Sequence, residues 1–215
     1  MLFVSIQPEK NEQYYSKNFI LKMAEAVKLG GAKGLRIESV NNIKYIKKKF
    51  DLPIIGLIKK YYLNKERYIT PTFKEIDSIA KTNCDYIAID YTLRDNLYLE
   101  GYLEITKHIH NNFKCKIIAD ISNLQEAKNA YECNVDYIST TLRGYTKYTK
   151  EISIPDISFV KELTELGINN IIAEGGYSNH SQYTEALNYG AKIIVIGTAI
   201  TRPHLIVKKI INGTY

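Results

Sequence analysis

The sequence predicts an α/β fold in which eight parallel strands close into a (β/α)8 barrel. Short apolar runs rich in Ile and Val alternate with helical segments from one end of the chain to the other, which is typical of a parallel sheet whose strands are connected by helices. The runs are apolar throughout, as expected for strands that are buried on both faces. Because no segment resembles a linker, residues 1–215 are expected to form one domain.

The predicted strands are the apolar runs themselves. They are expected at residues 2–6, 34–37, 54–58, 86–89, 116–119, 137–140, 171–174 and 193–196. Pro53 immediately precedes the third run, and glycines follow the last two. Proline and glycine commonly mark the ends of regular elements, so they support these boundaries.

The predicted helices lie between and after the strands. The spacing of apolar residues favours helices at 18–29, 41–49, 72–81, 99–111, 157–166, 198–201 and 204–211. Asn123 and Ser178 have side chains that can accept hydrogen bonds from a first helical turn. They are therefore expected to cap two further helices, which end near residue 132 and at Gly190.

The composition is that of an ordinary globular protein. Hydrophobic residues make up 45% of the chain, and no apolar run approaches the roughly 20 residues of a membrane span. The net charge is +6, but the lysines are spread over predicted helices, and the cluster at residues 47–49 closes a helix, where cations offset the helix dipole. We therefore expect neither a nucleic-acid nor a membrane partner.

The cysteines and the first residues of the chain indicate where in the cell the protein is expected. Cys84, Cys115 and Cys133 are odd in number and far apart, and no Cys-x-x-Cys pair or cysteine–histidine cluster occurs. Neither a disulfide framework nor a zinc site is therefore expected. The first apolar run is far too short for a signal peptide. These features favour a reducing, cytoplasmic location and no bound metal.

The last two predicted strands suggest a phosphate site. One run ends at Gly175 and Gly176, and the other at Gly197, where the backbone can approach a ligand closely. The short helix that begins at Thr198 would direct its unpaired N–H groups at the same point, and Arg202 would add a guanidinium. Barrels of this class often bind phosphate after strands seven and eight. The alternative is a pair of ordinary strand-to-helix turns.

Polar side chains follow most of the predicted strands. They are Gln7, Arg36, Lys59, Asp90, Asp120, Glu174 and Arg202. In a barrel the carboxyl ends of all strands meet at one face, and polar residues there are commonly functional. For Asp90 a helix N-cap is an equally good interpretation. Asp120 has less structural reason to be there, because Asn123 is the better cap.

Lys59 is the strongest single candidate for catalysis. It follows a buried run directly, so its ammonium group is expected to point into the barrel mouth, whereas Lys60 should face elsewhere. A desolvated lysine has a lowered pKa and can act as a base or form a Schiff base. Glu174 is expected across the mouth, where it can pair with Lys59 or serve as an acid or base.

With these residues in place, the chain resembles the N-acetylmannosamine-6-phosphate 2-epimerases, bacterial enzymes of sialic-acid breakdown. The matching stretches run in family order at residues 4–7, 34–36, 53–59, 68–72, 118–121, 136–146, 172–175 and 196–203. The resemblance implies a dimeric barrel that interconverts N-acetylmannosamine 6-phosphate and N-acetylglucosamine 6-phosphate without a cofactor, metal or nucleotide.

The resemblance also assigns roles to individual residues. It implies that Lys59 is the catalytic base and that Glu174 takes part in opening the sugar ring or acts as an acid or base. The substrate contacts that it implies are Gln7, Arg36, Asp120 and Thr140, and the phosphate contacts are Arg202 and the glycine-ended strands. Two other functions stay open on the sequence alone. One is a different phosphate-binding barrel, such as an aldolase that forms a Schiff base at Lys59, and the other is a non-catalytic protein that binds a sugar phosphate or nucleic acid.

Overall fold

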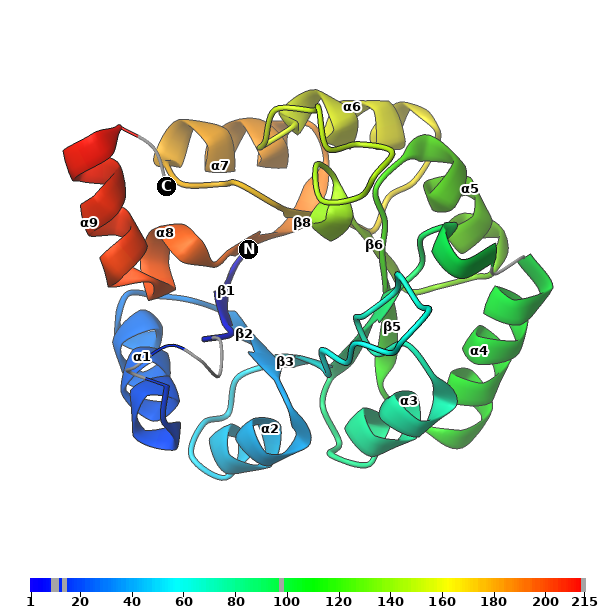
Figure 1. Ribbon diagram of the computed structural model, residues 1–215, viewed down its shortest axis with the longest axis horizontal. Helices are drawn as coiled ribbons and strands as arrows, with labels where there is room; N and C mark the ends of the chain where they lie inside the picture. The colour runs from blue at the N-terminus through cyan, green and yellow to red at the C-terminus, as the bar shows by residue number, and fades with distance from the viewer. Residues whose placement is uncertain (9–11, 13–14, 97–98, 214–215) are drawn as a thin grey trace.

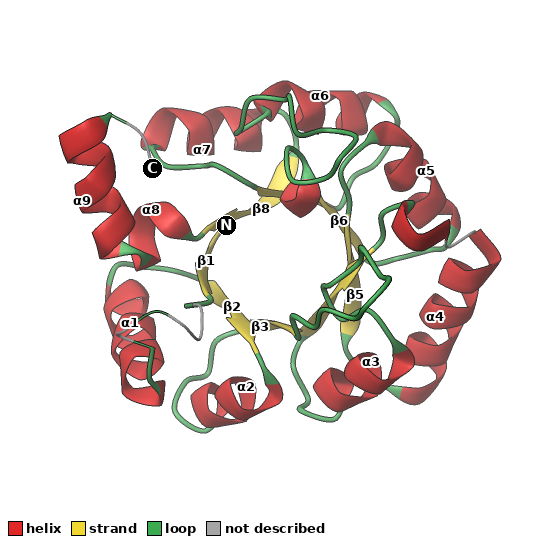
Figure 2. Ribbon diagram, viewed as in Figure 1, coloured by secondary structure: helices red, strands yellow, loops and turns green. Residues whose placement is uncertain are grey.

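The computed structural model, which describes residues 1–8, 12, 15–96 and 99–213, is a closed barrel of eight parallel strands. Neighbouring strands pair in sequence order, and the last pairs with the first, so the sheet has no open edge. Figure 2 shows the strands as an inner ring and the helices as an outer one. The predicted (β/α)8 barrel is confirmed. The strands are β1 (Leu2–Ile6), β2 (Gly34–Glu38), β3 (Ile54–Leu57), β4 (Tyr86–Asp90), β5 (Lys116–Asp120), β6 (Tyr137–Ser139), β7 (Ile171–Glu174) and β8 (Ala191–Ile196).

The helices follow the strands around the barrel (Figure 1). They are α1 (Lys17–Leu29), α2 (Val40–Lys47), α3 (Phe73–Ala80), η1 (Arg94–Asn96), α4 (Leu99–Asn112), α5 (Leu124–Glu132), η2 (Thr140–Leu142), α6 (Ile157–Glu165), α7 (His180–Asn188), α8 (Thr198–Thr201) and α9 (Pro203–Asn212). Asn123 caps α5 as predicted, in a reciprocal pair with Glu126. The predicted Ser178 cap was wrong, because the side chain of Asn179 accepts the hydrogen bond from Gln182 instead.

Alternation along each strand decides which residues face the barrel axis. In β3, Ile55 and Leu57 belong to the cluster inside the barrel, whereas Ile54 packs outward against the helices. The same alternation continues past the strand end and places Lys59 inward, in the cavity described below. Lys60, one residue further, is exposed and lies over the ring of Tyr62.

Aromatic rings fill the interior at the amino-terminal end of the strands. Tyr86 makes edge contacts with both Phe3 and Tyr137. Gly34 makes room for the Phe3 ring, since a Cβ at this position would lie 2.4 Å from it. These residues belong to a separate interior cluster with the inward aliphatic residues of the strands. The functional end of the barrel therefore rests on a packed floor.

The segment between β3 and α3 leaves the barrel and returns as a small hairpin. Lys59 and Ile69 form an antiparallel bridge, and the Lys60 N–H donates to the Tyr68 carbonyl. Asp90, at the end of β4, accepts hydrogen bonds from the backbone of Tyr68 and from Arg94. Asp90 therefore fixes this hairpin, and it neither caps a helix nor lines the cavity described below.

Further structural observations concern membranes, metals and disulfides. Within the described residues, no helix has the length and apolar character needed to cross a membrane. The same part of the chain contains no group of three or more His, Cys, Asp or Glu side chains arranged to hold a metal ion. Cys84, Cys115 and Cys133 are all described and buried, and none of them forms a disulfide.

Candidate active site

A cavity of about 620 Å³ opens at the carboxyl ends of the strands. Most of the residues that the sequence proposed for the site line this cavity together, although they come from distant parts of the chain. They are Gln7, Arg36, Lys59, Glu174, Gly175, Gly176, Gly197, Thr198 and Arg202. Because β3 and β7 lie four strands apart in a ring of eight, Lys59 and Glu174 approach the cavity from opposite sides.

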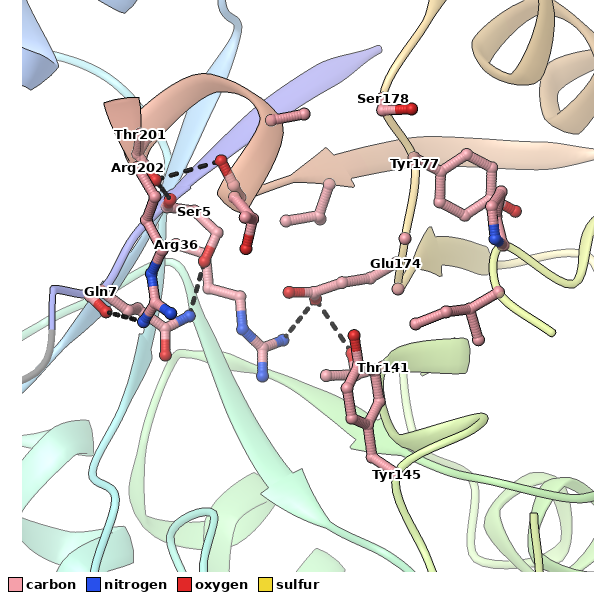
Figure 3. Close-up of a pocket in the computed structure, with 18 of the residues that line it drawn as sticks. Ser5, Gln7, Arg36, Thr141, Tyr145, Glu174, Tyr177, Ser178, Thr201 and Arg202 are labelled. Atoms are coloured by element: carbon pink, nitrogen blue, oxygen red, sulfur yellow. Dashed lines mark hydrogen bonds and ion pairs between the residues drawn. The ribbon is translucent and has the colours of Figure 1, made fainter. Parts of the chain in front are cut away.

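Arg36 is the centre of the buried charge network. Its side chain is only 1% exposed, and its two terminal nitrogens lie 3.2 and 2.6 Å from the carboxylate oxygens of Asp120. The Nη1 atom is also 3.0 Å from Oε2 of Glu174. Figure 3 shows the Glu174 carboxylate directed at Arg36 and Thr141. Two carboxylates thus share one permanent cation at the floor of the cavity.

The structure separates Asp120 and Thr140 from the other predicted site residues. Asp120 is fully buried and is not among the residues that line the cavity, so it orients Arg36 rather than facing a ligand. The Thr140 hydroxyl bonds to the backbone N–H and carbonyl of Glu174. The expectation that Thr140 contacts substrate therefore needs correction, because its hydroxyl is hydrogen-bonded to the backbone of β7. The neighbouring Thr141 lines the cavity instead.

Several residues on the cavity wall were not predicted from the sequence, and three of them interact with the charged groups of the site. These three are Thr141, Tyr68 and Tyr145. A signal for Thr141 was present in the sequence, because it has the same parity as Tyr137, which packs inside the barrel, whereas Thr140 has the parity of the outward-facing Ile138. Tyr68 lies in the returning arm of the hairpin rather than at the end of a barrel strand, and Tyr145 lies in the loop after η2. The only sequence signal for the two tyrosines was their place in stretches that match the family.

Two neighbouring side chains pack against the ring of Tyr68. Tyr61 stacks on it at a centroid distance of 5.2 Å, and the Arg94 guanidinium lies 5.6 Å from the ring centre. Burial, followed by the nearby Asp90 carboxylate, raises the pKa of Tyr68 to about 12. Its phenol therefore stays neutral at physiological pH and can donate a hydrogen bond into the cavity.

The pKa of Glu174 is also shifted. Burial raises it above the usual range for a glutamate, and the Asp120 charge acts in the same direction. Arg36, the Thr141 hydrogen bond and Lys59 act against this rise. A carboxyl group with a raised pKa, facing a lysine across a cavity, is the kind of pair that exchanges protons with a substrate.

The other end of the cavity is built from β7, β8 and their loops. Gly175 and Gly176 both have positive φ angles, of 112° and 79°, which favour glycine. Gly197 precedes α8, and the Thr201 hydroxyl in α8 donates to the Ser5 carbonyl of β1. Arg202 donates to the Gln7 carbonyl and lies 3.8 Å from Glu12. This end is lined by glycine backbone and a cation, whereas the opposite end holds Lys59.

The fold and the site define the class of protein. A closed (β/α)8 barrel carries a lysine, an arginine and a perturbed carboxyl group in a cavity at the carboxyl ends of its strands, where the catalytic groups of barrel enzymes lie. The chain is therefore a barrel enzyme.

The chain belongs to the N-acetylmannosamine-6-phosphate epimerase family. Residues 20–214 match the NanE family model, whose description is "Putative N-acetylmannosamine-6-phosphate epimerase". Similar curated proteins carry the name "Putative N-acetylmannosamine-6-phosphate 2-epimerase". One from Mycoplasma mycoides is 44% identical over 96% of this chain and 92% of its own. One from Clostridioides difficile is 41% identical over 99% and 95%.

Solved structures agree with the family assignment. The N-acetylmannosamine-6-phosphate 2-epimerase from Clostridium perfringens has a TM-score of 0.91 and 39% identity, covering 98% of this chain and 92% of its own. A thiamine phosphate pyrophosphorylase from Pyrococcus furiosus has a TM-score of 0.59 at 15% identity, over 93% and 86% of the two chains. The second similarity concerns the fold alone.

Proposed function

We propose that this chain interconverts N-acetylmannosamine 6-phosphate and N-acetylglucosamine 6-phosphate by inverting C2, a step in the breakdown of amino sugars. The observation that carries the proposal is the cavity in which Lys59 and Glu174 face each other from opposite sides, with Arg36 at its floor. The family and the names of the relatives supply the substrate pair.

The residues have the chemistry that this reaction needs. When the sugar ring is open, the C2 proton lies beside the C1 carbonyl and can be removed by a base. We assign that role to Lys59, which enters the cavity at the end of β3. Arg36 and the neutral Tyr68 phenol are donors for the charge that develops on the carbonyl oxygen. Glu174 acts as a general acid or base on the side of the cavity opposite Lys59.

The second end of the cavity is the proposed phosphate anchor. Gly175, Gly176 and Gly197 bring backbone close to the ligand, Thr198 begins α8, and Arg202 supplies positive charge. An anion held there would fix the far end of the sugar. That constraint would keep C2 near Lys59 and reduce the entropy cost of reaction. Gln7, which lines the cavity at the end of β1, is proposed to contact the sugar.

The setting of the enzyme is also proposed. Residues 1–215 are taken as one barrel domain that works in the cytoplasm, consistent with three cysteines outside any disulfide. We further propose a homodimer, because α9 presents Val207, Ile210 and Ile211 on its exposed face. No cofactor, nucleic-acid or membrane partner enters the proposal.

Isotope exchange in heavy water tests the reaction. Either sugar phosphate should gain deuterium at C2 and be converted into the other epimer. NMR monitors both the exchange and the conversion. Lys59→Ala should slow deuterium exchange and epimerisation by about 10²- to 10⁴-fold, the usual contribution of a general base. Lys60→Ala is the matched control and should leave both rates unchanged, because Lys60 lies outside the cavity.

The same experiment separates the alternatives. Absence of both exchange and epimer with the wild-type protein would rule out the epimerase. Reductive trapping of a covalent adduct on Lys59 by borohydride would favour an aldolase that forms a Schiff base. Binding of the sugar phosphate without exchange would favour a non-catalytic binding protein.

A further inference from the structure

The Thr141 hydroxyl lies among three oxygen atoms. Its Oγ1 is 2.9 Å from Oδ1 of Asp120, 2.9 Å from Oε2 of Glu174, and 2.8 Å from the Ser139 hydroxyl. A threonine hydroxyl has one hydrogen to donate and can accept further bonds through its lone pairs. It can therefore donate to only one of the two carboxylates at a time, although the geometry suits both.

Arg36 makes different contacts with the carboxylates of Asp120 and Glu174. Both of its terminal nitrogens donate hydrogen bonds to Asp120. Glu174 contacts only one of them, Nη1, and that atom also bonds to Asp120. Two-point binding to arginine holds a carboxylate in its ionised form more strongly than a single contact. Asp120 is also fully buried away from the cavity, while Glu174 lines it. Glu174 is therefore the member of the pair that gains and loses a proton during reaction.

We propose that Thr141 is a positioning residue whose hydroxyl hydrogen turns between Glu174 and Asp120 as Glu174 loses or gains a proton. When Glu174 is ionised, Thr141 donates to its Oε2. When Glu174 is protonated, the ionised Asp120 is the stronger acceptor, and the Thr141 hydrogen moves to it. No bond is broken in Thr141 itself, since only its O–H rotates. The proposal rests on the acid–base role of Glu174 in the proposed function.

This arrangement lowers the cost of changing the charge on Glu174. The charged or titratable groups that face Glu174 are Arg36 from β2, Lys59 from the segment after β3, Asp120 from β5 and Tyr145 from the loop after η2. Deleting the Thr141 hydroxyl removes its hydrogen bonds to Glu174 and Asp120 and leaves the other three groups unchanged. A change in the titration of Glu174 can therefore be assigned to the lost hydroxyl.

Thr141→Val tests the proposal, because it keeps the branched shape and removes the hydroxyl. The pKa of Glu174 should rise by up to about one unit, because the two protonation states lose unequal hydrogen bonds. The ionised form loses a bond to Glu174, which has one Arg36 contact, whereas the protonated form loses a bond to Asp120, whose charge is already offset by two Arg36 contacts. The apparent pKa assigned to Glu174 in the pH profile of kcat/KM should rise with it. Thr141→Ser should restore both values. Thr184→Val, which alters an exposed threonine of α7, is the control.

Carbon-13 NMR of glutamate-labelled protein without substrate supplies a second readout. The Glu174 signal is the one that is missing in Glu174→Gln. A higher pKa in Thr141→Val but not in Thr141→Ser supports the inference even if the sugar phosphates prove not to be the substrates. An unchanged pKa in Thr141→Val overturns it, whether or not the enzyme epimerises. If Thr141→Val does not fold, Thr141→Ala makes the same deletion and is judged by the same two outcomes.

Discussion

Among the individual residues, Arg36 shows most clearly how the site is prepared for a ligand. It is the largest of the fully buried side chains, and burying a cation is costly unless it is paired. Asp120 and Glu174 supply that pairing. Its Nε atom is nevertheless buried without a hydrogen-bond partner among the described residues. A rigid cation held in this way can stabilise developing charge without reorganising during the reaction.

Asp90 gives a prediction about stability at the same scale. Burial raises its pKa to about 6, although the Arg94 charge and hydrogen bonds from Thr92 and Tyr68 act against this rise. Because the folded state holds this proton more tightly than the unfolded state, its contribution to stability is greatest below about pH 4. The contribution is lost as the pH rises through about 6.

The measurement is urea unfolding of the wild type and of Asp90→Asn across this pH range. The difference in unfolding free energy, wild type minus variant, should fall by about 2–3 kcal/mol between pH 4 and pH 7. Asp51→Asn, at an exposed position, should show no such trend. A flat difference for Asp90→Asn would mean that the Arg94 pair keeps Asp90 ionised throughout.

Among the elements, the loop between β7 and α7 combines a left-handed backbone with close packing. Gly176 has a φ angle of 79°, and a Cβ there would lie 2.8 Å from backbone atoms of Ile154 and Pro155. Gly197, at the end of β8, has a negative φ, and its Cβ would meet Ser5 at 3.4 Å. The two glycines therefore serve different purposes, although the sequence presented both as glycines at strand ends.

Alanine substitution should separate these purposes. Gly176→Ala should lower the unfolding free energy by about 1–3 kcal/mol, because it adds strain at a positive φ as well as a backbone clash. Gly197→Ala should leave stability nearly unchanged but weaken binding of the sugar phosphate, since a methyl group would stand where the anion approaches. Thermal unfolding and calorimetric titration measure the two effects. Equal stability of the two variants would contradict the packing argument.

The same elements show what the sequence could and could not predict. The apolar runs predicted the barrel, and alternation beyond β3 predicted that Lys59 faces inward and Lys60 outward. Alternation from β6, with Tyr137 inward and Ile138 outward, also indicates Thr141 rather than Thr140, but Thr140 was chosen from the family resemblance. The stacking around Tyr68 depends on a hairpin that returns to the barrel, and no local pattern encodes that return.

At the scale of the whole molecule, α9 stands apart from the other helices. Figure 1 shows it at the periphery of the helix ring, next to α8, and none of its residues is fully buried. Val207, Ile210 and Ile211 are 53%, 78% and 75% exposed and lie on one helical face. An apolar helix face of this kind is the natural candidate for the proposed contact between two copies.

Light scattering after size exclusion tests this contact. The wild type should elute as a dimer, and Ile210→Glu combined with Ile211→Glu should give a folded monomer, because charges would be buried without partners at the interface. Asn212→Glu adds a negative charge to the same helix at an exposed position outside this apolar set and should leave the dimer intact. A monomeric wild type would refute the proposal directly.

The ring of Phe3, with Tyr86 and Tyr137 around it, closes the barrel beneath the charged groups. Solvent and sugar therefore have to reach Lys59 from the mouth, and whatever is formed has to leave by the same route. In the proposed reaction the two epimers occupy one cavity and differ at a single carbon, so the enzyme cannot take up one while it still holds the other. Each should therefore act as a competitive inhibitor of the conversion that produces it.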